Sequence, residues 1–108
     1  MRELSRLATF IASVDVPDTA RATARNAVQD AIGVTLAGAA EPAAKIVQRV
    51  ASFDGGPGPS SILGTTEMAG PSYAALTNGT SAHALDFDDM CWVTLAHPSA
   101  PLVAASLA

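Results

Sequence analysis

The first half of the chain carries apolar residues at helical spacing. Between residues 4 and 14, apolar positions recur at the period of one face of an α-helix. Pro17 suits the first turn of a second helix, which is expected at about Asp18 to Ala37. Glu41-Pro42 opens a third helix, whose apolar face reaches Phe53. The pattern therefore predicts three successive helices before residue 54.

A glycine- and proline-rich stretch then interrupts the pattern. Residues 54–59 are expected to form a loop that ends the third helix, and they are the only clear candidate for an internal boundary in the chain. The following residues 60–64 are compatible with an extended segment that is too short to make a sheet. Thr66 with Glu67 resembles the start of another helix.

The last part of the sequence predicts two further helical stretches. One begins at Pro71, is interrupted at Asn78-Gly79 and resumes for a turn or two over Ser81 to Leu85. The other begins at Pro98 and runs to Ala108 without a terminal glycine, charge or cap. An uncapped end of this kind is typical of a truncated domain. We therefore expect the isolated chain to be poorly stable.

Composition narrows the fold class. The 108 residues are 49% apolar, rich in alanine and only 5% aromatic, which favours closely packed helices. We expect a single all-α helical bundle with at least four helices and no sheet of three or more strands. The net charge of −4 argues against binding to nucleic acid or to an anionic membrane surface. One cysteine and no convincing signal segment indicate a cytoplasmic protein.

Chemically active side chains gather in one segment of the second half. Asp86, Asp88 and Asp89 place three carboxylates close together, and His83 and His97, the only histidines, bracket them. Neighbouring carboxylates repel one another, and histidine exchanges a proton near neutral pH. The segment therefore has the equipment of a general acid–base site.

The same residues also have plainer interpretations. Asp86 could cap a helix or be a solvated acid, and His97 could be a buried histidine held by a backbone carbonyl. His83 and Asp89 could support the site through a polar network that orients the other two. Asp88 is expected to be structural or to face solvent.

Other kinds of chemistry are less favoured. Metal binding is not expected, because ligand spacing such as His-x-x-x-His is missing. Cys91 has no basic neighbour to lower its pKa, which argues against a reactive thiol. All six Lys and Arg residues precede residue 50, so counter-charges for an anionic substrate must come from elsewhere.

Several blocks of residues occur together in the order found in one enzyme family. They are Leu7–Ile11, Asp30–Gly38, Ile62–Gly64, Ala74–Thr80, His83–Asp89 and His97–Ser99. The blocks cover essentially the whole chain, and the last three together are highly specific. On these residues the chain resembles the N-terminal part of the MmgE/PrpD family, which includes 2-methylcitrate dehydratase, cis-aconitate decarboxylase and iminodisuccinate epimerase.

The resemblance carries expectations for fold and site. It implies that residues 1–108 are the N-terminal portion of a large all-helical domain, truncated and without the smaller α/β lid domain. It implies a homodimer and an active site between the two domains that needs neither metal nor cofactor. It places catalytic roles on Asp86 and His97, while further catalytic Lys, His and Tyr residues of the family lie downstream.

One position departs from the family pattern. Many members carry Thr directly after the Asp-Phe-Asp-Asp block, where this chain has Met90. A thioether cannot donate a hydrogen bond to a carboxylate. The pocket is therefore expected to differ from that of 2-methylcitrate dehydratase, which adds weight to the epimerase-like branch.

Two functions remain open from the sequence. The first is an enzyme, or a piece of one, that dehydrates or epimerises a small di- or tricarboxylate. Asp86 and His97 would share its proton transfers. The second is a catalytically inactive helical module, or pseudo-enzyme fragment, that only associates with other chains.

Overall fold

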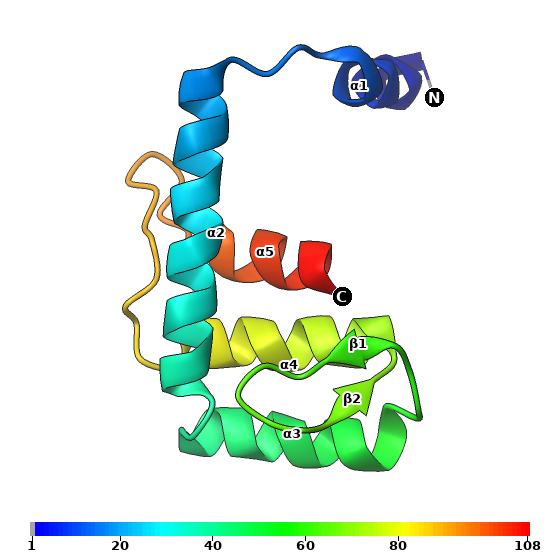
Figure 1. Cartoon of the computed structure of the whole chain (residues 1–108), viewed down its shortest axis with the longest axis vertical. Coiled ribbons are helices and arrows are strands. Elements are labelled where there is room, and N and C mark those ends of the chain that lie inside the picture. Colours follow the sequence, from blue (N-terminus) through cyan, green and yellow to red (C-terminus); the bar gives the residue numbers. More distant parts are fainter. Residues whose placement is uncertain (1) are drawn as a thin grey trace.

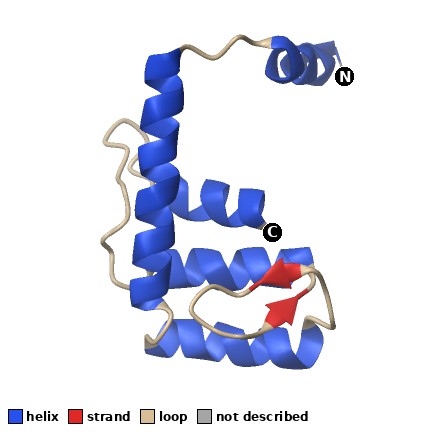
Figure 2. Cartoon of the chain, viewed as in Figure 1, coloured by secondary structure: helices blue, strands red, loops and turns tan. Residues whose placement is uncertain are grey.

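The computed structural model describes residues 2–108, which form five helices and one pair of very short strands (Figures 1 and 2). The elements in chain order are α1 (Arg2–Ser13), α2 (Asp18–Gly38), α3 (Pro42–Asp54), β1 (Ser60–Ser61), β2 (Met68–Ala69), α4 (Pro71–His83) and α5 (Ser99–Leu107). The strands pair only with each other, in antiparallel register. The predicted all-α class is confirmed for the part of the chain that the structure describes.

None of the helices within residues 2–108 combines the length and the apolar character that crossing a membrane requires.

Helix α4 is the centre of the fold, and α2, α3 and α5 all pack against it (Figure 1). Its buried side chains are small, as Ala74, Thr77 and Ser81 illustrate. A Cβ atom added at Gly38 would collide with the backbone carbonyl of Ser81, so only glycine allows the end of α2 to come this close to α4. The core around α4 is therefore built from small side chains and not from the large apolar ones of a typical domain.

The two strands are held against α4 by a buried amide. The side chain of Asn78 accepts a hydrogen bond from the backbone N–H of Leu63 at 2.9 Å and donates one to the carbonyl of Ser61 at 3.0 Å. Asn78 is among the largest fully buried side chains. The hairpin is thus fixed through one residue in the middle of a helix.

Two local predictions are wrong for physical reasons. Helix α4 is not interrupted at Asn78-Gly79, because the Asn78 amide bonds to the hairpin and does not compete for its own helix backbone. No helix starts at Thr66 with Glu67, because the adjacent backbone pairs as β2 and Glu67 accepts a hydrogen bond from Ile62.

Helix α1 forms where the apolar spacing predicts it, but it buries no residue. Its apolar side chains Leu4, Leu7, Phe10 and Ile11 are all exposed. Figure 1 shows α1 set apart from the body beyond the start of α2. The Cα radius of gyration is 15.3 Å, whereas a compact domain of this length has about 13 Å.

Candidate active site

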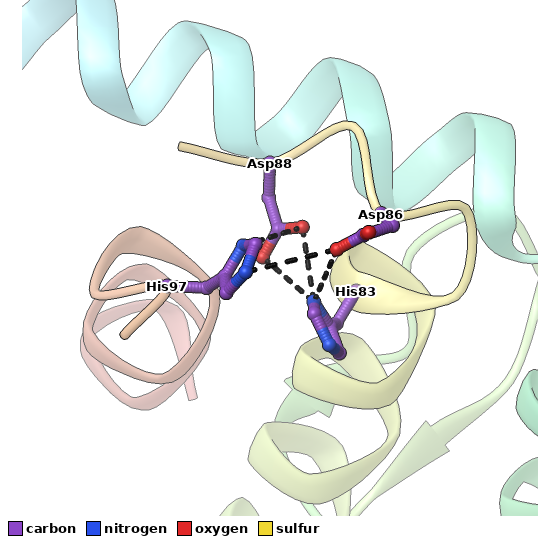
Figure 3. A group of neighbouring side chains, drawn as sticks. All are labelled: His83, Asp86, Asp88 and His97. Carbon is purple, nitrogen blue, oxygen red and sulfur yellow. Dashed lines mark hydrogen bonds and ion pairs between the residues drawn. The ribbon is translucent and has the colours of Figure 1, made fainter. Parts of the chain in front are cut away.

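The site lies where α4 ends and the chain loops across to α5. His83 is the last residue of α4, and His97 lies two residues before α5 begins at Ser99. Between them Asp86 adopts a left-handed backbone conformation, with φ of 56°, and its N–H donates to the carbonyl of His83 at 3.1 Å. Aspartate tolerates this conformation better than most residues. The turn points the Asp86 side chain back towards the end of the helix (Figure 3).

Four side chains converge at this turn, as Figure 3 shows. Asp86 Oδ1 lies 3.9 Å from His83 Nδ1 and 3.7 Å from His97 Nε2. Asp88 Oδ1 lies 3.0 Å from His83 Nδ1 and 3.3 Å from His97 Nδ1. Each imidazole therefore lies between two carboxylates. The structure brings the two predicted catalytic residues, Asp86 and His97, into one cluster.

The two carboxylates differ sharply in exposure. The side chain of Asp86 is 77% exposed, whereas that of Asp88 is 1% exposed and is hydrogen-bonded to His83. Of the two expectations for Asp88, structural or solvent-facing, the second is wrong, because the loop turns its side chain inward between the two histidines. Sequence reasoning missed this residue, since its burial depends on a turn that no periodicity marks.

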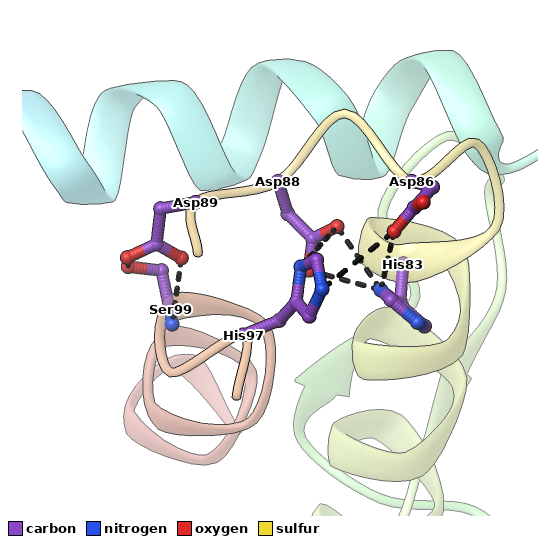
Figure 4. Close-up of polar contacts among 6 residues, drawn as sticks. All are labelled: His83, Asp86, Asp88, Asp89, His97 and Ser99. Atoms are coloured by element: carbon purple, nitrogen blue, oxygen red, sulfur yellow. Dashed lines mark hydrogen bonds and ion pairs between the residues drawn. The ribbon is translucent and has the colours of Figure 1, made fainter. Parts of the chain in front are cut away.

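Asp89 has a separate task from its neighbour. Its carboxylate accepts hydrogen bonds from the backbone N–H of Ser99 at 3.0 Å and from the Ser99 hydroxyl at 2.8 Å (Figure 4). These bonds satisfy a free donor in the first turn of α5. Asp89 thus ties the acidic segment to the start of α5, two residues after His97.

The structure decides between some of the plainer interpretations of the histidines. No backbone carbonyl holds His97 within residues 2–108, because its buried Nδ1 has no hydrogen-bond partner there. The ring instead packs edge-on against His83, with the ring centroids 4.6 Å apart. His83 is tied to Asp88 and also approaches Asp86, so its supporting position agrees with a polar network.

The cluster also has enough donors for a metal ion. One ligand atom from each of His83, Asp86, Asp88 and His97 lies within 4.8 Å of the others. The argument from missing His-x-x-x-His spacing therefore does not hold, because a loop supplies ligands without helical spacing. Imidazole and carboxylate together suit Zn²⁺ or Mn²⁺. That the protein needs no metal stays a prediction.

A short hairpin-like turn follows the acidic segment. The N–H of Cys91 donates to the carbonyl of Ala96 at 2.8 Å, and Leu95 has a left-handed φ of 51°. Hydrogen bonding by Thr94 lowers the pKa of the Cys91 thiol. The prediction from the sequence considered only basic neighbours, and none contributes here; the pKa is lowered instead by hydrogen bonds from a hydroxyl and from backbone N–H groups.

Positive charge is missing around the carboxylates. Within residues 2–108, no Lys or Arg forms an ion pair with Asp86, Asp88 or Asp89. Within those residues, His83 and His97 are the only side chains that pair with Asp86 or Asp88. The described residues thus provide acid–base groups but no cation for an anionic substrate.

A shallow hollow beside His83 does not fill this gap. It has a volume of about 690 Å³ and lies between α4 and α5, with Leu76, Gly79, Thr80 and Pro101 in its lining. The lining is mostly apolar, and His83 is its only ionisable member. Its lining thus contains no Lys or Arg that could bind a carboxylate.

The geometry thus defines a small helical domain with a cluster of acidic and histidine side chains at the loop between two helices. Comparison with known proteins gives the family of this domain. The chain belongs to the MmgE/PrpD family, because residues 2–108 match the MmgE/PrpD N-terminal domain. It is 32% identical over 106 residues to cis-aconitate decarboxylase of Aspergillus terreus, and equally to that of A. terreus strain NIH 2624. The match covers 97% of this chain and 20% of each relative. No solved structure matches.

Proposed function

We propose that this chain supplies the acid–base residues of an MmgE/PrpD enzyme acting on a small di- or tricarboxylate. The observation that carries the proposal is the approach of Asp86 Oδ1 to His97 Nε2 at 3.7 Å, with Asp86 open to solvent. A separation slightly beyond hydrogen-bond distance is usual for catalytic pairs before substrate binds. The similarity to cis-aconitate decarboxylase supports lyase chemistry and a carboxylate substrate.

The proposed chemistry is proton transfer at a carbon next to a carboxylate. In a dehydration, one group removes this proton and the other protonates the departing hydroxyl. In an epimerisation, the proton returns to the opposite face of the same carbon. In a decarboxylation, an acid protonates the carbon skeleton as CO₂ leaves. We propose that Asp86 and His97 share the proton transfers of whichever of these three reactions the enzyme catalyses.

The developing negative charge needs cations to stabilise it. Residues 2–108 place no Lys or Arg at the carboxylates, and the chain spans about a fifth of the length of the curated relatives that it matches. We therefore propose that the cations come from residues outside this sequence or from a second subunit of a homodimer. The exposed apolar face of α1 offers surface for such an association.

We further propose that the reaction needs no metal or cofactor and takes place in the cytoplasm. Dialysis of the complete protein against EDTA tests the first point. Activity is expected to survive, whereas activity lost on dialysis and restored by a divalent ion would contradict it. The ligand-like grouping of His83, Asp86, Asp88 and His97 makes this test informative.

The proposed function is tested by proton NMR of the complete protein in D₂O. Candidate substrates are 2-methylcitrate, citrate, cis-aconitate and iminodisuccinate. Deuterium is expected to enter one of them at a carbon next to a carboxylate, because proton transfer is reversible even without net turnover. Absence of exchange and turnover with every compound would contradict the proposal.

One observation favours a second function, a catalytically inactive interaction module. Within residues 2–108, Asp86 and Asp88 pair with histidines and with no Lys or Arg, while α1 displays an exposed apolar face. The coding sequence beyond Ala108 separates the two functions. An open frame encoding further helices with Lys, His and Tyr residues supports the enzyme, and a stop codon supports the module.

A further inference from the structure

Asp88 is a buried carboxylate with very few partners. Its side chain is 1% exposed, and within residues 2–108 its only hydrogen bonds are to His83 Nδ1, at 3.0 and 3.2 Å. Burying an ionised carboxylate is costly unless nearby groups compensate the charge. A purely structural role at this position would be served better by an amide or an apolar side chain.

Both histidines present the same ring nitrogen to Asp88. His83 Nδ1 is hydrogen-bonded to it, and His97 Nδ1 lies 3.3 Å from Asp88 Oδ1 without being aligned for a hydrogen bond. Since His97 Nδ1 is buried and has no other partner in the described chain, a small ring rotation would direct its N–H at Asp88. Figures 3 and 4 show the carboxylate of Asp88 lying against both rings.

We infer that Asp88 is the positioning residue of this site, which holds the proton of each neutral imidazole on Nδ1 and leaves Nε2 of His97 directed at Asp86. A carboxylate that binds Nδ1–H fixes both the tautomer and the orientation of a histidine. The same logic explains why a buried aspartate orients the histidine of serine proteases. The inference rests on the proposed function, because Nε2 of His97 is the atom offered for proton transfer.

An asparagine in place of Asp88 separates this role from simple packing. Its shape is nearly the same, but it offers one acceptor oxygen and one donor NH₂ group. It can accept the Nδ1–H of one ring while its NH₂ group faces Nδ1 of the other. Asp88→Asn is therefore expected to drive one of the two histidines into the Nε2–H tautomer.

Nitrogen-15 NMR of the imidazoles tests the inference directly in the complete protein at alkaline pH. Signals are assigned with His83→Gln and His97→Gln. In the wild-type protein both rings are expected to carry the proton on Nδ1. A wild-type His97 in the Nε2–H form overturns the inference, even if Asp88→Asn does not fold.

Kinetics of Asp88→Asn complete the test. The kcat is expected to fall at least about 10-fold, the lower end of the cost of losing a group that orients a histidine at a metal site, with a smaller change in KM. Asp54→Asn, at an exposed acid that ends α3, is the matched control and should retain wild-type kcat and both tautomers. A folded Asp88→Asn protein with wild-type kcat, or with both rings still Nδ1–H, overturns the inference. If the wild-type protein turns over no substrate, the proposed function fails, while the tautomers still decide the role of Asp88.

Discussion

Helix α1 and the segment from α4 to α5 differ in which of their side chains are buried. Helix α1 has a regular apolar face and buries none of it. The α4–α5 segment has small residues in its helices and polar residues in its loop, yet it contains the buried centre of the molecule. Residues that look best suited to a core thus lie outside, and residues that look like loop surface lie inside.

The difference shows that periodicity specifies a helix but not its partner. Phe10 of α1 is 60% exposed, whereas Asn78 in α4 is 2% exposed and anchors the hairpin. At α4, glycine and alanine residues let the helix backbones approach closely, as at Gly38. Small side chains therefore fill the core there instead of large apolar ones. These contacts bring the end of α4, where His83 lies, close to the end of α2.

The largest expected effect concerns the cluster itself. In the complete protein, Asp86→Asn and His97→Gln are each expected to lower kcat at least about 10²-fold, because each removes a titrating group from acid–base catalysis. Asparagine also tolerates the left-handed backbone at residue 86, so the fold should survive. Steady-state kinetics with circular dichroism checks this prediction.

Asp54→Asn serves as the control for these variants, since it makes the same chemical change at an exposed position. It is expected to leave kcat unchanged. Near-wild-type turnover in a folded Asp86 or His97 variant would return that residue to a structural role.

A second pair of variants contrasts the two regions in the 108-residue chain. Asn78→Ala is expected to cost about 1–3 kcal/mol of unfolding free energy, because the N–H of Leu63 and the carbonyl of Ser61 lose their partner. Phe10→Ser is expected to cost under about 0.5 kcal/mol, as for other exposed positions. Urea denaturation measures both. Equal costs would show that α1 is packed in solution.

Much of the fold could be predicted because it depends on local signals. Prolines and the helical spacing of apolar residues predicted the first residues of α2 and α3 accurately. The role of Asn78 could not be predicted, since its partners lie 15 and 17 residues away. The resemblance to the family marked Asp86 and His97 as catalytic candidates. The burial of Asp88 could not be predicted, because it follows a left-handed turn at Asp86 that the sequence pattern does not indicate.

A smaller effect is expected from the anchor of α5. Asp89→Ala removes both bonds to Ser99 and should cost about 1 kcal/mol, the usual value of a lost helix cap. Because the same bonds hold the segment that carries His97, kcat should fall as well. Thermal unfolding and kinetics measure the two effects, and a drop in stability with unchanged kcat would separate Asp89 from the site.

The smallest expected effect is at Cys91, on the loop between the two histidines. Hydrogen bonding by Thr94 lowers the pKa of the Cys91 thiol, so more of it is thiolate near neutral pH. Thr94→Val should raise this pKa and shift the pH dependence of alkylation by iodoacetamide to higher pH. Ser106→Ala, on α5, is the control. Coinciding pH profiles would show that Thr94 does not act on the thiol.

The central claim is that Asp86 and His97 act together in one proton transfer. It is tested most directly by a double-mutant cycle on the rate of substrate deuterium exchange in the complete protein, using Asp86→Asn, His97→Gln and the double variant. The account predicts that the double variant is little slower than either single variant, since removing one partner already disables the shared step. Losses that multiply would show that the two residues act independently and would contradict the account.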